Sequence, residues 1–149
     1  MQGVVPLTLD AKGRFVIPVN FRDELVAASE SKPLVLSWNP NGSLTLYPDQ
    51  DWQPLYEKLS RIDDFDPWRG PVKNVMLASK QEIAPKDVGD RILIASGLRE
   101  MAGLEKEIFV AGFGRVLQIW NKEQWKRQCM LATQAFQKKP ETVNFWEGL

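Results

Sequence analysis

The stretch LDAKGRFVIPVNFRDEL, from Leu9 to Leu25, returns in altered form as KDVGDRILIASGLREMA, from Lys86 to Ala102. At an offset of 77 residues, five positions carry the same or a similar residue: Asp10 and Asp87, Arg14 and Arg91, Ile17 and Ile94, Phe21 and Leu98, Arg22 and Arg99. Similar residues in the same order indicate an internal repeat, and such a repeat decides the fold before any single element does.

A second block extends the repeat. LVLSWNPNGSLTLYPDQDW, from Leu34 to Trp52, falls on EIFVAGFGRVLQIWNKEQW, from Glu107 to Trp125, at an offset of 73. The matched pairs include Leu36 and Phe109, Leu46 and Ile119, Tyr47 and Trp120, and Trp52 and Trp125. The change of offset requires one four-residue insertion in the first copy, between Arg22 and Leu34. A loop absorbs such an insertion easily, because closure entropy grows slowly with loop length.

Each copy has the same predicted layout of strand, turn, strand, short helix and hairpin. In the first copy these are a strand over Val4 to Leu9, the turn DAKG, a strand over Arg14 to Ile17 that Pro18 ends, a helix over Val19 to Ala28, and hairpin strands over Pro33 to Trp38 and Ser43 to Tyr47. The hairpin turn NPNG has Pro second and Gly fourth, as type I turns favour. In the second copy the corresponding segments are Ile92 to Ile94, Gly97 to Met101, Ile108 to Ala111 and Val116 to Trp120.

The sequence divides into a first unit over residues 4–52, a helical connector over 53–79, a second unit over 80–125, and a C-terminal helix and tail over 126–149. In the connector, Asp66-Pro67 has the pattern of an N-cap followed by an N1 proline, and the acidic residues Asp63, Asp64 and Asp66 are interpreted as part of that cap. Each unit of about 50 residues is too small for a good core of its own. We therefore expect an α+β fold in which the two units pack by pseudo-twofold symmetry into one β-barrel-like body with flanking helices.

The composition narrows the class of function. The chain is 44% hydrophobic and 26% charged, as in ordinary globular proteins. It contains no histidine and one cysteine, so a Cys/His zinc site and a disulfide within the chain are excluded. No cofactor, metal, catalytic residues or small-molecule substrate is expected, and an enzyme is disfavoured. The absence of a long apolar run and of a signal-like N-terminus predicts a cytoplasmic protein without a membrane partner.

The turn Asp10-Ala11-Lys12-Gly13-Arg14 is the sharpest chemical feature. The Asp10 carboxylate can accept backbone N–H groups, and Gly13 permits a positive φ. Lys12 and Arg14 then project from the turn as two positively charged side chains, which can bind phosphate or the O6 and N7 edge of guanine. The alternative is structural: Asp10 and Arg14 pair across the turn and only stabilise the hairpin.

Three other features have structural interpretations. The six tryptophans are expected in the core and at subunit contacts. The motif GFG, from Gly112 to Gly114, aligns with the NPNG turn and is interpreted as a hairpin turn rather than a phosphate loop, which would have to open a helix. Cys129 falls on the apolar face of the C-terminal helix, with Trp125, Ala132 and Phe136, and is interpreted as a small core residue.

The runs LTLDAKGRFVIP, DRILIASGLREMAGLEKEIFVAG and QIWNKEQW resemble the MraZ family, a bacterial branch of the AbrB-like DNA-binding folds. The similarity extends from about Leu7 to Trp125 and includes the D-x-x-x-R element twice. It implies two tandem swapped-hairpin AbrB-like units and ring-shaped homo-oligomers. It also implies a nucleoid-associated repressor that binds short direct repeats in its own promoter, upstream of the division and cell-wall gene cluster.

The resemblance assigns DNA contacts to Lys12, Gly13 and Arg14 in the first copy and to Arg91 in the second, with Asp10 and Asp87 as structural residues of the motif. The second copy departs from the family pattern, because Asp90 stands where Gly precedes the arginine and Ala95 stands where Pro often follows the strand. We therefore expect the first copy to bind DNA and the second mainly to complete the fold and the ring. The alternative function is an AbrB-fold antitoxin-like module that binds protein, with DNA binding secondary.

Overall fold

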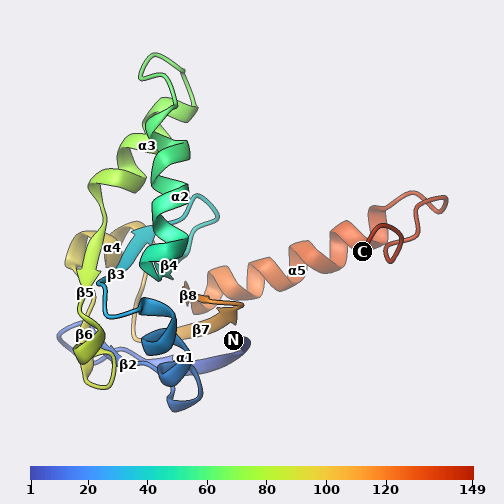
Figure 1. Cartoon of the computed structure of the whole chain (residues 1–149). Coiled ribbons are helices and arrows are strands. Elements are labelled where there is room, and N and C mark those ends of the chain that lie inside the picture. Colours follow the sequence, from blue (N-terminus) through green and yellow to red (C-terminus); the bar gives the residue numbers. More distant parts are fainter.

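The computed structural model describes the whole chain, residues 1–149, and consists of an α+β body with two projecting helical arms (Figure 1). The strands are β1 (Gln2–Thr8), β2 (Arg14–Val16), β3 (Leu34–Trp38), β4 (Leu44–Tyr47), β5 (Gln81–Ile83), β6 (Arg91–Leu93), β7 (Glu107–Phe113) and β8 (Val116–Asn121). The helices are α1 (Val19–Ser29), α2 (Asp49–Ser60), α3 (Arg69–Ala78), α4 (Ser96–Met101) and α5 (Lys122–Lys138), with a 3₁₀ turn η1 (Pro85–Asp87).

The two copies exchange strands. Six strands form one antiparallel sheet in the order β1-β7-β8-β4-β3-β5, and β2 and β6 form a separate antiparallel ribbon. The first strand of each copy pairs with the hairpin of the other, because β1 lies beside β7 and β5 lies beside β3. This arrangement confirms the expected fold of two tandem swapped units.

Strand register shows where the pseudo-twofold axis passes. In the ribbon, Phe15 pairs with Ile92, which is the same position in the second copy. At the centre of the sheet, Thr45 of β4 pairs with its own counterpart Gln118 of β8. A strand can pair with its repeat equivalent at the same position only if the axis runs through that pair, so the axis crosses both the ribbon and the sheet.

Both copies contribute to one core. A single cluster of 19 buried residues contains Phe15, Ile17 and Phe21 from the first copy and their counterparts Ile92, Ile94 and Leu98 from the second. In the ribbon, the side chains of Phe15 and Ile92 are buried, while their neighbours along each strand face outward with the period of two that a strand imposes. The core therefore fixes which side chains the ribbon presents to solvent.

The first arm is the α2–α3 hairpin, which stands away from the sheet (Figure 1). Its base is held by the buried ring of Trp52 and by the Ser37 hydroxyl, which donates to the Met76 carbonyl oxygen over 2.9 Å. The α3 helix begins at Arg69, later than the expected Asp66-Pro67 start. Asp66 still has a capping role, because its carboxylate accepts from the N–H groups of Trp68 and Arg69.

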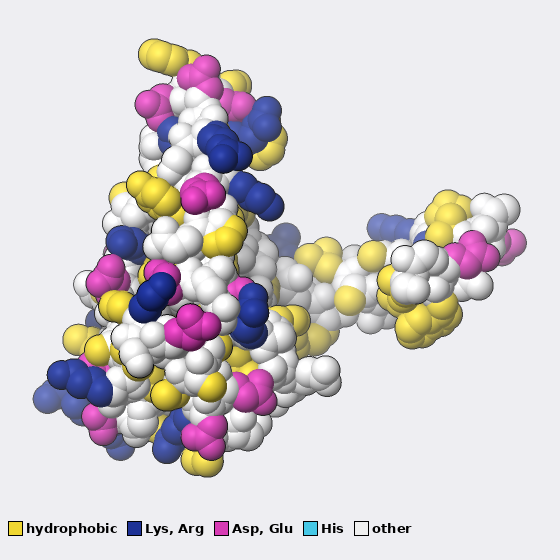
Figure 2. All heavy atoms as spheres, viewed as in Figure 1, with side chains coloured by type: hydrophobic (Ala, Val, Ile, Leu, Met, Phe, Trp, Pro, Cys, Tyr) yellow, Lys and Arg dark blue, Asp and Glu magenta, His cyan; other side chains and the backbone are white.

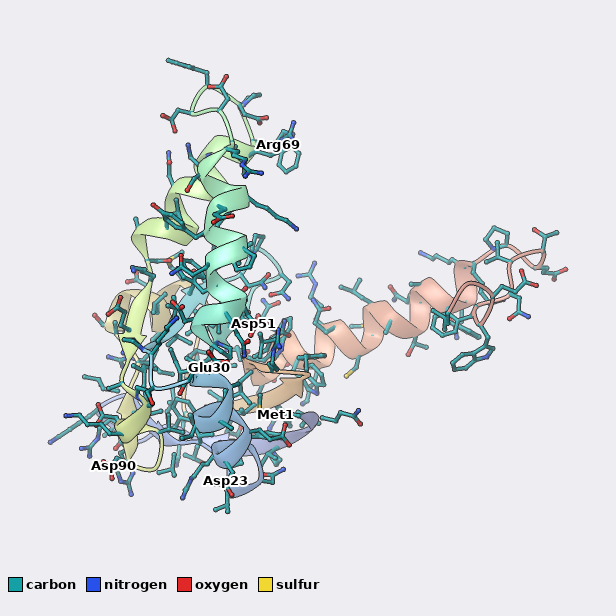
Figure 3. The ribbon with its side chains drawn as sticks, in the orientation of Figure 1. Met1, Asp23, Glu30, Asp51, Arg69 and Asp90 are labelled. Carbon is teal, nitrogen blue, oxygen red and sulfur yellow. The ribbon has the colours of Figure 1, made fainter.

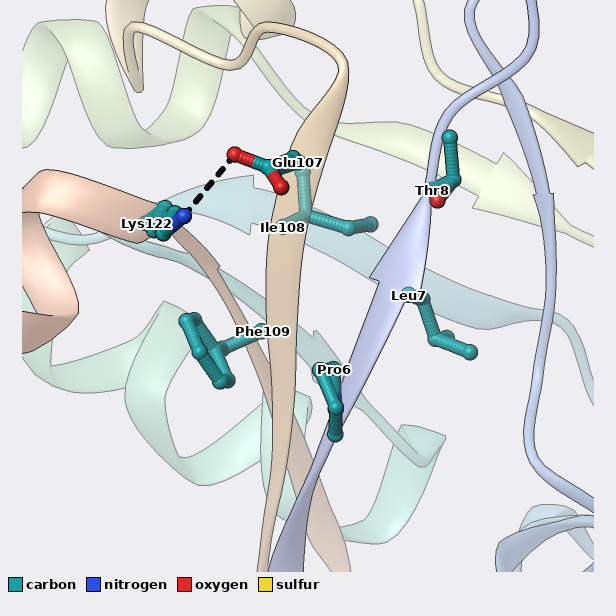
Figure 4. A pocket seen from close by; sticks show the side chains of 7 residues that line it. All are labelled: Pro6, Leu7, Thr8, Glu107, Ile108, Phe109 and Lys122. Atoms are coloured by element: carbon teal, nitrogen blue, oxygen red, sulfur yellow. Dashed lines mark hydrogen bonds and ion pairs between the residues drawn. The ribbon is translucent and has the colours of Figure 1, made fainter.

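The second arm is α5, which is anchored only by its first turn. The Asn121 side chain accepts from the N–H groups of Glu123 and Gln124, and Lys122 pairs with Glu107 over 3.0 Å (Figure 4). This hydrogen bond and the Lys122 charge lower the pKa of the Glu107 carboxyl. The Trp125 ring lies 6.4 Å from Phe109 between ring centres. Beyond this point the helix leaves the body and buries no residue.

One interpretation of a single side chain needs correction. Cys129 is exposed and is not a core residue, because nothing in the chain covers the face of α5 on which it lies. Of the six tryptophans, Trp52 and Trp120 are buried in the core, whereas Trp68 and Trp146 are largely exposed. The GFG motif is a hairpin turn as expected, since Phe113 of β7 pairs with Val116 of β8. None of the helices combines the length and the hydropathy needed to cross a membrane.

Candidate nucleic-acid interface

The turn that joins β1 to β2 is closed by its own aspartate. One Asp10 oxygen, Oδ1, accepts from the backbone N–H groups of Lys12 and Arg14, each over 2.9 Å. Two backbone hydrogen bonds also close the loop: the Asp10 N–H donates to the Arg14 carbonyl oxygen over 2.9 Å, and the Gly13 N–H donates to the Asp10 carbonyl oxygen over 3.0 Å. Gly13 adopts a φ of 85°, a conformation that side chains disfavour. These bonds give the loop Asp10–Arg14 a fixed shape.

The second Asp10 oxygen holds two arginines, one from each copy. Arg14 Nε lies 2.8 Å from Oδ2, and Arg91 Nη1 lies 3.4 Å from the same atom. The Arg14 and Arg91 side chains are 37% and 59% exposed, whereas Asp10 is 22% exposed. The ion pair across the turn is therefore present, but it leaves both guanidinium groups open to solvent with their orientation restrained.

Hydrogen bonding also sets the charge of Asp10. The Arg14 backbone N–H lowers the pKa of the carboxyl, partial burial opposes this effect, and the Arg14 guanidinium and the Lys12 N–H lower it further. The net result is a pKa below the ordinary value of 3.8. Asp10 is therefore ionised at neutral pH and attracts both arginines.

The outer face of the β2–β6 ribbon presents this pair of arginines. Arg14 lies opposite Leu93 and Arg91 lies opposite Val16, and all four side chains point away from the buried Phe15 and Ile92. Figure 2 shows Lys and Arg side chains gathered at the lower left of the molecule, at the end where Figure 1 places β2 and β6. We name the loop Asp10–Arg14 together with Arg91 the arginine face.

Arg99 supports the loop from the second copy, a role that inspection of the sequence missed. Its Nε donates to the Ile94 carbonyl over 2.9 Å, and its guanidinium lies so close to Gly13 that an added Cβ would be 2.5 Å from Arg99 Cζ. Its repeat counterpart Arg22 makes the same bond to the Ile17 carbonyl over 2.8 Å. An arginine repeated at the same helix position in both copies was the available signal.

The second loop is built differently from the first. Val88 is fully buried there, whereas the first loop has the exposed residue Ala11 at the corresponding position. The Asp87 carboxylate makes no hydrogen bond, so it does not close a turn as Asp10 does, and Arg91 pairs across the ribbon with Asp10 instead. Asp90 lies at the same end of the molecule and is exposed (Figure 3). The structure thus brings Asp10, Lys12, Gly13, Arg14 and Arg91 together and leaves Asp87 outside.

The rest of the surface offers little for metal chemistry. The described side chains include no group of three or more acidic, histidine or cysteine residues close enough to share an ion. A hollow over the paired strands β1 and β7 is lined by Pro6, Phe109 and the Glu107–Lys122 pair, and this pair anchors the start of α5 (Figure 4). The arginine face is thus the candidate functional site.

Comparison with known proteins gives the family. Residues 1–69 and 76–144 match the family described as "MraZ protein, putative antitoxin-like". The chain belongs to the MraZ family. The two matched parts of the MraZ model correspond to the two copies of the repeat, with the break inside α3.

Relatives named transcriptional regulator MraZ align over most of the chain. The protein of that name from Dechloromonas aromatica is 41% identical over 134 residues, covering 90% of this chain and 89% of the relative. The one from Aromatoleum aromaticum is 35% identical and covers 85% and 84%, and the one from Nitrosomonas europaea is 33% identical and covers 89% and 88%. Each of these alignments is long enough to include both copies of the repeat.

Proposed function

We propose that this chain is a sequence-specific DNA-binding transcriptional regulator that contacts DNA through Lys12, Gly13, Arg14 and Arg91. The observation that carries the proposal is the arginine face, where one aspartate orients two exposed guanidinium groups on a rigid support. The names of the relatives, transcriptional regulator MraZ, support the same role. Of the four units set out above, 4–52 and 80–125 would supply the site, 53–79 would connect them, and 126–149 would serve assembly.

The shape of the site suits the major groove of DNA. That groove admits a two-stranded β-ribbon, and β2 and β6 form such a ribbon with its arginines outward. A guanidinium whose Nε is held by a carboxylate keeps its two terminal nitrogens for a partner. These nitrogens match the O6 and N7 acceptors of guanine or the oxygens of a phosphate. Lys12, exposed at the tip of the loop, adds a phosphate contact.

Charge favours binding by several subunits together. The subunit has 19 basic and 19 acidic residues, so one copy gains little long-range attraction to DNA. A ring-shaped homo-oligomer would repeat the arginine face at regular spacing and engage several short direct repeats at once, which raises the effective concentration of each contact. We propose this mode of binding at the protein's own promoter, upstream of division and cell-wall genes, with repression through exclusion of polymerase. The protein would then act in the cytoplasm, on the nucleoid.

The test is binding to a duplex that contains one repeat from upstream of the gene, compared with a random duplex. One base-specific contact contributes about 1–3 kcal/mol, so Arg14→Ala should weaken specific binding by roughly 5- to 150-fold. Lys12→Ala should weaken both duplexes alike and reduce the salt dependence. Lys58→Ala is the matched control, because Lys58 is exposed on α2, on the far arm. Unchanged affinity of the Arg14 variant would refute the assignment.

The alternative, a protein-binding antitoxin-like module, is favoured by one observation, the large aromatic side chains exposed on both arms. The same titration separates the two functions. A module whose main partner is a protein would bind upstream and random DNA equally weakly.

A further inference from the structure

The outer face of the β2–β6 ribbon carries an exposed leucine beside its two arginines. Leu93 lies directly opposite Arg14 across the ribbon and two residues after Arg91 on the same strand. Side chains directly opposite in an antiparallel pair, and side chains two residues apart on one strand, lie on the same face. Leu93 therefore adjoins both arginines of the arginine face, and the residue is 51% exposed.

The same ribbon position is apolar in both copies. Val16 is the counterpart of Leu93 in the first copy, and it lies opposite Arg91 as Leu93 lies opposite Arg14. Val16 is half-buried, so Leu93 is both the longer and the more exposed of the two side chains. A single exposed leucine is ordinary on a protein surface, but this one shares its face with the groups proposed to bind DNA.

Hydrogen bonds hold the backbone of Leu93 in place. Gln81 Nε2 donates to the Leu93 carbonyl oxygen over 2.7 Å, and Gln81 Oε1 accepts from the Ala95 N–H over 2.9 Å. The counterpart of Gln81 in the first copy is Val4, whose side chain cannot make these bonds. The end of β6 is therefore restrained by the ribbon and by Gln81, and a restrained backbone loses little entropy on binding.

Charges of both signs surround Leu93. Besides the two arginines, Leu93 borders a hollow whose lining includes three acidic residues: Glu82, Asp87 and Asp90. Glu82 pairs with Lys80 over 3.3 Å, whereas the carboxylates of Asp87 and Asp90 form no ion pair. Carboxylates repel phosphate, so a duplex that lies across the ribbon places base edges rather than its backbone beside this hollow.

In the major groove, an apolar side chain can recognise the C5-methyl group of thymine. We propose that Leu93 contacts a thymine methyl group next to the base that Arg14 contacts. The Cα atoms of opposite residues in a ribbon are about 4.5–5.5 Å apart and successive bases are about 3.4 Å apart, so the thymine lies within about two base pairs of that base. The inference rests on the proposed DNA-binding function and adds a specificity-determining residue to it.

The test removes the methyl group from the DNA alone. The probe is a duplex with one repeat from upstream of the gene and its flanking base pairs, in which deoxyuridine replaces each thymine in turn. Deoxyuridine pairs as thymine does but lacks the methyl group. At one thymine, the replacement should weaken wild-type binding about 4-fold, which is the effect of exposing one buried methyl group.

Variants show whether Leu93 makes the contact. Leu93→Ala should bind the thymine and deoxyuridine duplexes equally, because the side chain that contacts the methyl group is gone. Leu93→Met keeps an apolar side chain of similar volume and should still prefer thymine. Leu131→Ala is the matched control, the same substitution at a leucine of similar exposure on α5, and should prefer thymine as wild type does.

Two results would overturn the proposal. One is equal wild-type binding to thymine and deoxyuridine at every position of a duplex that wild type prefers over random DNA. The other is a Leu93→Ala variant that prefers thymine as strongly as wild type does. The proposed function fails in a different way, since wild type would then bind the upstream and random duplexes equally, and the inference would fall with it.

Discussion

Gly13→Ala tests whether Arg99 and the first loop are fitted to each other. The substitution has two separate costs. A residue with a side chain at a φ of 85° costs about 1–2 kcal/mol. The new Cβ would also lie 2.5 Å from Arg99 Cζ, so the guanidinium must move and weaken its bond to the Ile94 carbonyl. A hydrogen bond from a charged donor contributes about 1.5–3 kcal/mol, and part exposure reduces this to about 1–1.5 kcal/mol. The free energy of unfolding should therefore fall by about 2–3.5 kcal/mol.

The assay is urea unfolding followed by the fluorescence of the buried tryptophans, at one fixed protein concentration because assembly adds to stability. A double-mutant cycle isolates the second cost. In an Arg99→Ala background only the backbone cost should remain, so the coupling energy should be about 1–1.5 kcal/mol. Gly89→Ala is the matched control in the second loop, where φ is not positive and an added Cβ meets nothing within 4 Å. Equal stability of the Gly13 and Gly89 variants, or no coupling to Arg99, would refute the reasoning.

Two further predictions concern the loops. The pKa of the Asp10 carboxyl in the folded protein lies below its ordinary 3.8, so the ionised carboxylate stabilises the fold fully above about pH 4, and this stabilisation is lost as the pH falls through the lowered pKa. The difference in unfolding free energy between wild type and Asp10→Asn should therefore shrink between pH 5 and pH 2, and a constant difference would contradict the assignment. Val88→Ala removes two methyl groups from a fully buried position and should lower the free energy of unfolding in urea by about 1.5–2.5 kcal/mol. Ala11→Val, at the exposed counterpart, should change that free energy by no more than about 0.5 kcal/mol, and equal effects of the two substitutions would mean that the loops are alike.

Features with a local cause were predictable from the sequence. The NPNG turn forms because Pro40 and Gly42 suit its backbone, and the Gly42 N–H donates to the Asn39 carbonyl over 2.9 Å. The repeat predicted one shared core, because two small units with matching apolar positions must cover each other. The closing of the first loop by Asp10 also followed from the spacing of Asp10 and Arg14.

Features that depend on neighbours distant in the sequence were not predictable. Strand β5 has three residues, too few to show a period of two, and it forms because β3 lies beside it. Cys129 is exposed because an apolar stripe identifies a face of a helix and not whether anything covers it. Arg99 reaches Gly13 only in the folded chain, across 86 positions of sequence.

The exchange of strands between the copies also matters for synthesis. Val5 of β1 pairs with Val110 of β7, so β1 leaves the ribosome about 100 residues before its partner exists. At about 5–20 residues per second, that strand waits roughly 5–20 s with its backbone N–H and C=O groups unpaired. The first half of the chain cannot complete its fold during translation, and it is exposed to chaperones and to other nascent chains until the second copy arrives.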